Sequence, residues 1–236
     1  MVDIYGIKIH KGINEIAFNN LLTLVAPEKK DRIKKFKFFN DAQRCLLGDS
    51  LARYVICNKL GIKNSQLKFS NNKYGKPVLL EPQGLNFNIS HSGNWVVFAI
   101  DNKPVGIDVE TIKPINFDIA KRFFTEVEYN DLMAKDDNER LRYFYTLWTL
   151  KESYIKSVGK GLSISLNSFA IHIEYDNIWI NTNKKFSSCF FKLYEIDKDH
   201  IVAVCSQNKE CIPKIKIVNL YQLLDLNDYS FALFEH

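Results

Sequence analysis

The stretch Val105-Gly106-Ile107-Asp108-Val109-Glu110 alternates aliphatic residues with a glycine and two acidic residues. A period of two is typical of a strand that buries one of its faces. Asp108 and Glu110 would then point the same way, two residues apart, and Gly106 would leave room beside them. The stretch therefore predicts a half-buried strand that presents a pair of carboxylates.

A helical stripe further along the chain complements this acidic pair. Trp148, Glu152 and Lys156 are spaced i, i+4, i+8, which places them in one row on a helix. The apolar face of that helix would comprise Phe144, Leu147, Tyr154, Ile155 and Val158. Glu152 and Lys156 lie at the edge of this face, where residues that line a cleft are expected.

Together, the two motifs suit a divalent metal that holds a phosphorylated substrate, because both supply hard oxygen ligands and one adds an ammonium group. Each motif alone has a structural explanation. The acidic pair could be the solvent face of a strand, and Glu152 with Lys156 could be an ordinary ion pair on a helix.

The composition indicates a folded protein of one large or two small domains. The chain has 236 residues, of which 46% are hydrophobic. Its first residues lack a secretory signal, and the apolar run over residues 95–100 is too short to span a bilayer. The five cysteines show no zinc-binding spacing, and their odd number argues against a disulfide framework. We therefore expect a cytoplasmic protein with reduced thiols and no membrane association.

The net charge of +5 is unevenly distributed, because a basic cluster lies between Lys29 and Arg44. A basic excess attracts polyanions, and nucleic acid is the usual first hypothesis. No helix-turn-helix, zinc finger or aromatic RNA-binding signature accompanies the cluster. A small polyanionic ligand or an acidic protein partner fits equally well.

Secondary-structure signals in the first half predict a strand followed by helices and then short strands. Strands are expected at residues 4–9, 67–69, 86–90 and 95–100, with a turn at residues 92–94. Between them, a helix is expected to begin at an N-cap formed by Asn40 or Asp41 and to end at Gly61.

The second half repeats this order. A capping box over residues 125–128 predicts a helix through residue 132. This capping position already explains Glu128, so we do not count it among the site residues. Asn138 could cap a long helix that runs to about Val158, with strands at 168–173, 178–180, 190–196 and 201–205. The order predicts an α+β pseudo-dimer of two similar halves, residues 1–103 and 104–236. Each half would pack helices on a small antiparallel sheet, with the active site at the junction. The tail after Cys205 carries no usable motif.

Several segments together match a known family. These are residues 105–110 and 148–162, and also residues 27–29, 41–49, 74–77 and 87–93. The chain resembles the 4′-phosphopantetheinyl transferases of the surfactin-synthetase-activating type, in order and nearly without gaps from Tyr5 to about Cys205.

The resemblance implies transfer of the 4′-phosphopantetheine arm of coenzyme A, as co-substrate, to a serine of apo carrier proteins. The acceptors would be peptidyl, aryl or acyl carrier proteins of peptide, polyketide and fatty-acid synthases, and adenosine 3′,5′-bisphosphate would be released. Mg²⁺, or Mn²⁺, would bind Asp108, Glu110 and Glu152. The catalytic residues would be Glu152, Lys156 and His91, and whether Glu152 is a base or only a metal ligand stays open.

The resemblance also implies how coenzyme A would bind. Ser90, His91 and Lys156 would contact its phosphates, and the adenine pocket would include Tyr74, Gly75, Lys76 and Pro77, mostly through backbone groups. Lys29, Arg32 and Arg44 are the candidates for the 3′-phosphate. The protein would act as a monomer without nucleic acid. The alternatives are a nucleic-acid-binding protein that uses the basic cluster and, less favoured, a metal nuclease.

Overall fold

The first sheet has four strands in the order β11-β1-β5-β4, with bounds β1 Asp3–Lys8, β4 Asn86–Ser92, β5 Trp95–Asp101 and β11 Lys216–Ile217. The computed structural model describes residues 1–10, 12–175, 177–182 and 188–227. Strand β5 runs antiparallel to both β1 and β4, whereas β11 is parallel to β1. All residues of β5 are buried, so this strand is the centre of the first part of the fold.

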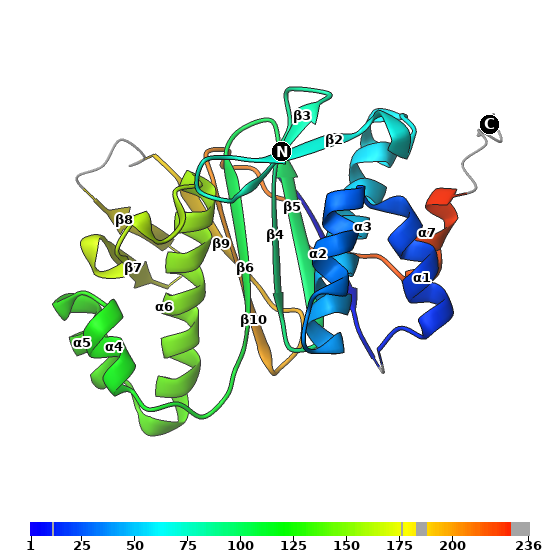
Figure 1. Cartoon of the computed structure of the whole chain (residues 1–236). Coiled ribbons are helices and arrows are strands. Elements are labelled where there is room, and N and C mark those ends of the chain that lie inside the picture. Colours follow the sequence, from blue (N-terminus) through cyan, green and yellow to red (C-terminus); the bar gives the residue numbers. More distant parts are fainter. Residues whose placement is uncertain (11, 176, 183–187, 228–236) are drawn as a thin grey trace.

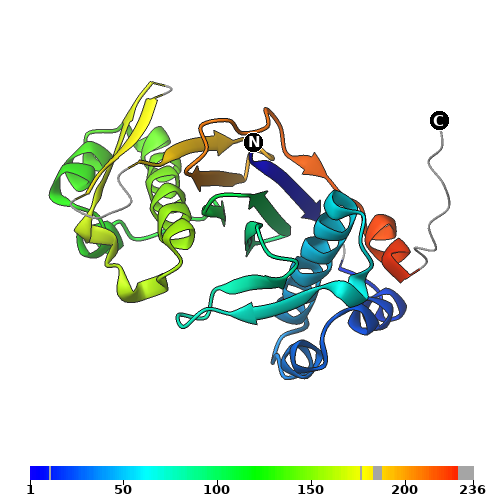
Figure 2. The same ribbon diagram turned by 90° about the horizontal axis from the view of Figure 1, so that it is seen from above.

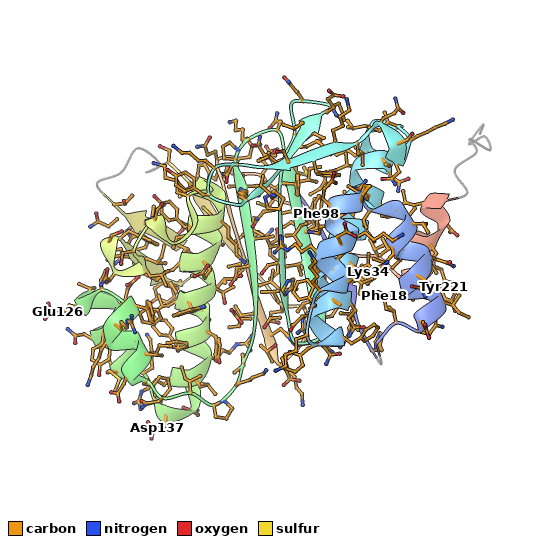
Figure 3. The ribbon with its side chains drawn as sticks, in the orientation of Figure 1. Phe18, Lys34, Phe98, Glu126, Asp137 and Tyr221 are labelled. Atoms are coloured by element: carbon orange, nitrogen blue, oxygen red, sulfur yellow. The ribbon has the colours of Figure 1, made fainter. Side chains whose placement is uncertain are left out.

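Helices cover one face of this sheet (Figure 1): α1 Glu15–Leu24, α2 Pro27–Lys34, α3 Phe39–Leu60 and α7 Leu220–Leu224. Helix α3 ends at Gly61, whose φ of 64° is left-handed, as predicted. The predicted N-cap at Asn40 or Asp41 is wrong, because both residues already lie inside the helix and Phe38 holds the cap position. Figure 3 shows Phe98 of β5 in the interior beside α3, with Lys34 and Tyr221 on the outer helices.

The second sheet has three antiparallel strands in the order β6-β10-β9, with bounds β6 Val105–Thr111, β9 Phe190–Tyr194 and β10 His200–Ser206. The long helix α6 Asp137–Val158 packs on β6 and β10. It begins one residue before Asn138, with Asp136 at the N-cap, so the predicted cap is wrong. Two shorter helices, α4 Asp118–Phe123 and α5 Glu126–Met133, flank α6, and α5 opens with the predicted capping box at Thr125.

Two hairpins complete the described strands: β2 Lys68–Asn71 with β3 Pro77–Glu81, and β7 Ala170–Glu174 with β8 Asn177–Asn181. Figure 2 shows the β2–β3 hairpin reaching from the first part of the molecule toward the second. The predicted strands are present with boundaries shifted by a few residues, whereas β3 and β11 were not predicted. The α+β class is confirmed. Within the described residues, no helix has the length and apolar character needed to cross a membrane.

The two sheets share a buried core between them, and this core decides which way the acidic pair points. Val105, Ile107 and Val109 of β6 belong to the same cluster as Val97 and Ala99 of β5. Because side chains alternate along a strand, the intervening residues of β6 face α6 instead. The predicted separation of an aliphatic face from an acidic face is therefore confirmed.

The segment after Cys205, which carries no motif, returns to the first sheet. Strand β11 pairs with β1, and Val218, Leu223 and Leu226 join the core formed by α1, α3 and β5. The first part of the fold is thus built from both early and late segments of the chain.

Candidate active site

One cavity of about 290 Å³ gathers residues from β4, β6 and α6. It is lined by Ile89, Ser90, His91, Asp108, Glu110, Trp148, Glu152 and Lys156. The structure therefore brings together the three predicted catalytic residues and the three predicted metal ligands. They come from three separate segments, one on the first sheet and two on the second part of the fold.

An ion pair between Lys156 and Asp108 forms the centre of this cavity. The Lys156 Nζ lies 2.5 Å from Asp108 Oδ1 and donates a second hydrogen bond of 2.8 Å to Ser90 Oγ. Ser90 Oγ in turn donates to Asp108 Oδ1 at 2.8 Å. The second carboxylate oxygen, Asp108 Oδ2, is buried and has no hydrogen-bond partner among the described residues. A buried unpaired carboxylate oxygen is costly, and a bound cation would satisfy it.

Gly106 allows β6 and α6 to approach closely enough for this ion pair. A Cβ at position 106 would lie 2.0 Å from the Ser153 carbonyl oxygen and 2.3 Å from the Ser157 nitrogen. The expectation that Gly106 leaves free space beside the carboxylates is therefore wrong, because helix backbone fills that space. Its role is to let the strand lie directly against the helix.

The cavity holds an excess of negative charge. Burial and the charge of Asp108 raise the pKa of Glu110 to about 6, although Ser92 and Lys156 oppose the shift. Burial and Asp108 also raise the pKa of Glu152, while Lys156 lowers it. Three carboxylates face one ammonium, which favours an added cation.

The donor set and the unpaired Asp108 oxygen fit Mg²⁺ or Mn²⁺, both of which prefer carboxylate oxygens. In the described part of the chain, however, no three His, Cys, Asp or Glu side chains are grouped closely enough to hold a metal ion. Asp108, Glu110 and Glu152 would have to draw together around the ion.

A second cavity of about 340 Å³ adjoins the first, because Ile89 lines both. Lys29, Arg32 and Pro77 line it, together with acidic Asp49, whose carboxylate lies 3.9 Å from Lys29 Nζ. The structure thus brings two of the three predicted 3′-phosphate ligands beside the active site.

Arg44 lies apart from this second cavity. It donates to Asp41 Oδ1 at 2.6 Å and to the Gly93 carbonyl at 3.0 Å. Partial burial and the nearby charge of Arg44 lower the pKa of His91. Arg44 is therefore grouped with His91 and not with Lys29 and Arg32.

The predicted adenine-pocket segment forms the turn of the β2–β3 hairpin. Gly75 adopts a left-handed φ of 87°, Tyr74 is exposed, and Pro77 begins β3. The Lys76 side chain reaches away from the turn: its Nζ donates to the carbonyls of Lys156 at 2.6 Å and Val105 at 3.1 Å. Burial lowers the pKa of Lys76 to about 8. This side chain ties the hairpin to α6. The backbone nitrogens of Tyr74, Gly75 and Lys76 already donate to oxygens of Asn72, so the turn could offer a ligand the carbonyl groups of Tyr74 and Gly75.

A buried ion pair between Lys151 and Glu128 was not predicted. The two side chains are 0% and 1% exposed. Glu128 accepts hydrogen bonds from Thr125, which belong to its capping role, and a further one from the Ile171 nitrogen. The signal in the sequence is that Lys151 falls on the apolar stripe between Leu147 and Tyr154, where a lysine needs a buried partner.

Comparison with known proteins identifies the family. Residues 104–205 match the model described as the 4′-phosphopantetheinyl transferase superfamily, and residues 14–103 match the one described as 4′-phosphopantetheinyl transferase, N-terminal. The chain is 41% identical to the 4′-phosphopantetheinyl transferase Sfp of Bacillus subtilis (strain 168), over 94% of this chain and 99% of that protein. It is also 41% identical to the 4′-phosphopantetheinyl transferase gsp of Aneurinibacillus migulanus, over 78% of this chain and 73% of that protein.

A more distant human relative, L-aminoadipate-semialdehyde dehydrogenase-phosphopantetheinyl transferase, is 33% identical over 76% of this chain and 66% of its own length. The chain therefore belongs to the 4′-phosphopantetheinyl transferase family, of the Sfp type, and it is an enzyme of that class.

Proposed function

We propose that this enzyme transfers the 4′-phosphopantetheine arm of coenzyme A to a serine hydroxyl of an apo carrier protein, and that it requires Mg²⁺, with Mn²⁺ as a substitute. The observation that carries the proposal is the cavity shared by Asp108, Glu110, Glu152 and Lys156. Carboxylates that can hold a metal, beside an ammonium, suit the transfer of a phosphoryl-type group.

Coenzyme A would lie across the two adjoining cavities. Lys29 and Arg32 would receive phosphate from its nucleotide end, and the backbone of the turn at Tyr74 and Gly75 would line the adenine pocket. Ser90 and His91 would meet the phosphates near Ile89, where the two cavities adjoin. Arg44 lies close enough to His91 to add positive charge there.

The residues of the active site would then divide the chemistry among them. Asp108, Glu110 and Glu152 would hold the metal, which when bound neutralises and orients the pyrophosphate. The serine oxygen attacks the β-phosphorus, a new phosphorus–oxygen bond forms, and the bond to adenosine 3′,5′-bisphosphate breaks. Lys156 stabilises the negative charge that develops on the reacting phosphate.

The serine proton would pass to Glu152, directly or through a water molecule. Its raised pKa makes this carboxylate a better base than an exposed glutamate. Metal binding and proton transfer compete for the same oxygens, and Glu152→Gln separates them. If the variant still binds Mn²⁺ but loses turnover, Glu152 acts as the base; if it loses both, Glu152 is needed as a ligand.

We further propose a monomer composed of two similar halves that divide between residues 103 and 104, with the active site at their junction. The predicted second half, residues 104–236, needs one correction, because residues 216–227 return to the first half. The two family models that meet between residues 103 and 104 support this division, as does the contribution of both sheets to one cavity. The acceptors would be peptidyl, aryl or acyl carrier proteins of peptide, polyketide or fatty-acid synthases.

The direct test is to incubate the protein with coenzyme A, Mg²⁺ and purified apo carrier proteins of each kind, and to weigh the carriers by mass spectrometry. The proposal expects a mass gain of one phosphopantetheine group, which is lost when EDTA replaces Mg²⁺. An unchanged mass for every carrier would contradict it. Binding to DNA or RNA would then favour a nucleic-acid-binding protein, and their cleavage a metal nuclease.

A further inference from the structure

The two sheets meet along a seam that has no backbone ladder among the described residues. Strands β4 and β6 lie side by side and belong to different sheets. Side chains of β4 accept the hydrogen bonds that a neighbouring backbone would otherwise accept. Asn88 Oδ1 accepts from the Ile107 nitrogen at 2.8 Å, Ser90 Oγ from Val109 at 3.4 Å, and Ser92 Oγ from Thr111 at 3.1 Å.

The two serines of this seam also bind the carboxylates of β6. Ser90 Oγ donates to Asp108 Oδ1 at 2.8 Å, and Ser92 Oγ donates to Glu110 Oε2 at 3.0 Å. A hydroxyl group can accept one hydrogen bond while it donates another, so each serine links the backbone of β6 to a carboxylate on the same strand. In both cases the carboxylate belongs to the residue that precedes the bonded nitrogen. Asn88 bonds no carboxylate in this way, because the residue that precedes Ile107 is Gly106.

The need for positioning differs between the two carboxylates. Asp108 is held by Lys156 as well as by Ser90. Glu110 has one more rotatable bond, and in the described part of the chain Ser92 is the side chain that hydrogen-bonds its carboxylate. The Thr111 hydroxyl lies 3.2 Å from Ser92 Oγ and can donate to it, which leaves the Ser92 proton for Glu110.

We propose that Ser92 is a positioning residue for the metal site, because it orders the carboxylate of Glu110 before the ion binds. This inference rests on the proposed function, in which Glu110 is a metal ligand. Side chains that hydrogen-bond a ligating carboxylate typically contribute about 10–100-fold to metal affinity. Ser92 does not need to touch the metal or coenzyme A to have this effect.

The test measures the affinity for Mn²⁺ from the electron paramagnetic resonance signal of the free ion, first for the wild-type protein and then for three variants. Ser92→Ala removes the bond to Glu110 and should weaken Mn²⁺ binding about tenfold or more. Ser92→Thr keeps the hydroxyl and should bind as the wild type does. Asn88→Ala is the matched control, because it removes a bond of the same seam that has no carboxylate partner, and its affinity should stay within about threefold.

Each outcome decides the matter. Wild-type affinity in Ser92→Ala would overturn the inference, and equal losses in Ser92→Ala and Asn88→Ala would replace it by a general loosening of the seam. If the wild-type protein itself failed to bind Mn²⁺, the proposed function would fall, and this inference with it. Thermal denaturation shows whether each variant is folded, and Ser92→Cys, whose thiol is a weak donor, replaces Ser92→Ala if the latter is not.

Discussion

Helix α6 carries two lysine–carboxylate pairs that are five residues apart and differ in almost every physical respect. The pair of Lys151 with Glu128 is fully enclosed, and its polar atoms are satisfied: Lys151 also donates to the Phe169 carbonyl at 2.7 Å. In the pair of Lys156 with Asp108, the lysine side chain is 28% exposed, and one buried carboxylate oxygen has no hydrogen-bond partner in the part of the chain that the structure describes. All polar atoms of the first pair, which we call the enclosed pair, have hydrogen-bond partners, whereas the second, which we call the open pair, keeps an oxygen that has none among the described residues.

If the proposed function holds, one helix carries a pair that stabilises the fold and another that serves catalysis. A complete buried pair leaves nothing for a ligand to satisfy, so it can only hold α5, α6 and β7 together. The open pair keeps an unsatisfied oxygen and an accessible ammonium, which are the groups that a metal and a phosphate require. A lysine in a sequence motif therefore has to be interpreted together with the number of hydrogen bonds that its carboxylate partner already makes.

The largest expected effect comes from breaking the enclosed pair. Lys151→Met leaves the Glu128 carboxylate buried without its cation and should lower the free energy of unfolding by about 3–5 kcal/mol. The double variant Lys151→Met with Glu128→Gln should recover part of this loss, because it removes the uncompensated charge. Urea denaturation measures both. A single variant as stable as the wild type would show that the pair does not stabilise the fold.

Breaking the open pair should lower the catalytic rate more than the stability of the fold. Lys156→Ala should lower turnover about 10²–10³-fold, because a charge aimed at the transition state is lost. The matched control is Lys160→Ala, in the exposed turn after the helix, which should stay within about twofold. Steady-state rates with a carrier protein decide the question. Equal losses in the two variants would refute the distinction between the lysines.

A smaller effect is expected from Lys76, which hydrogen-bonds the backbone at Lys156 and Val105. Lys76→Met removes the hydrogen bonds to the carbonyls of Lys156 and Val105 and should lower turnover about tenfold by shifting the end of α6. Binding of adenosine 3′,5′-bisphosphate should hardly change, because the side chain faces the protein. Lys73→Met, in the same hairpin, is the control. Loss of nucleotide affinity without loss of turnover would instead make Lys76 a ligand.

The smallest effect concerns the charge excess around the open pair. The raised pKa of Glu110, about 6, means that protonation favours the folded state without metal. The stabilising contribution is present below pH 4.5 and is lost as the pH rises through about 6. In EDTA, the melting temperature of the wild type relative to Glu110→Gln should therefore fall between pH 5 and pH 7.5. Mn²⁺ should remove this trend, and a constant difference in EDTA would contradict it.

The sequence predicted where the candidate site residues lie better than it predicted the contacts around them. Regular alternation and helical spacing place Asp108, Glu110, Glu152 and Lys156 correctly, because these periods follow from backbone geometry alone. The buried ion pair of Glu128 with Lys151 was not predicted, because the capping box already explained the presence of Glu128. Neither the unpaired oxygen of Asp108 nor the contact of Lys76 with α6 could be predicted, since both depend on how distant segments pack.

The pairing of β1 with β11 has a consequence for the order in which the molecule folds. Residues 3–8 pair with residues 95–101 and residues 216–217, so both pairings of β1 join segments that are distant in sequence, and such contacts slow folding. During synthesis, all of β6, α6 and β10 emerge before β11 can pair with the free edge of β1. Until then that edge is open to other strands. We therefore expect the part of the fold that begins the chain to be the last to be completed.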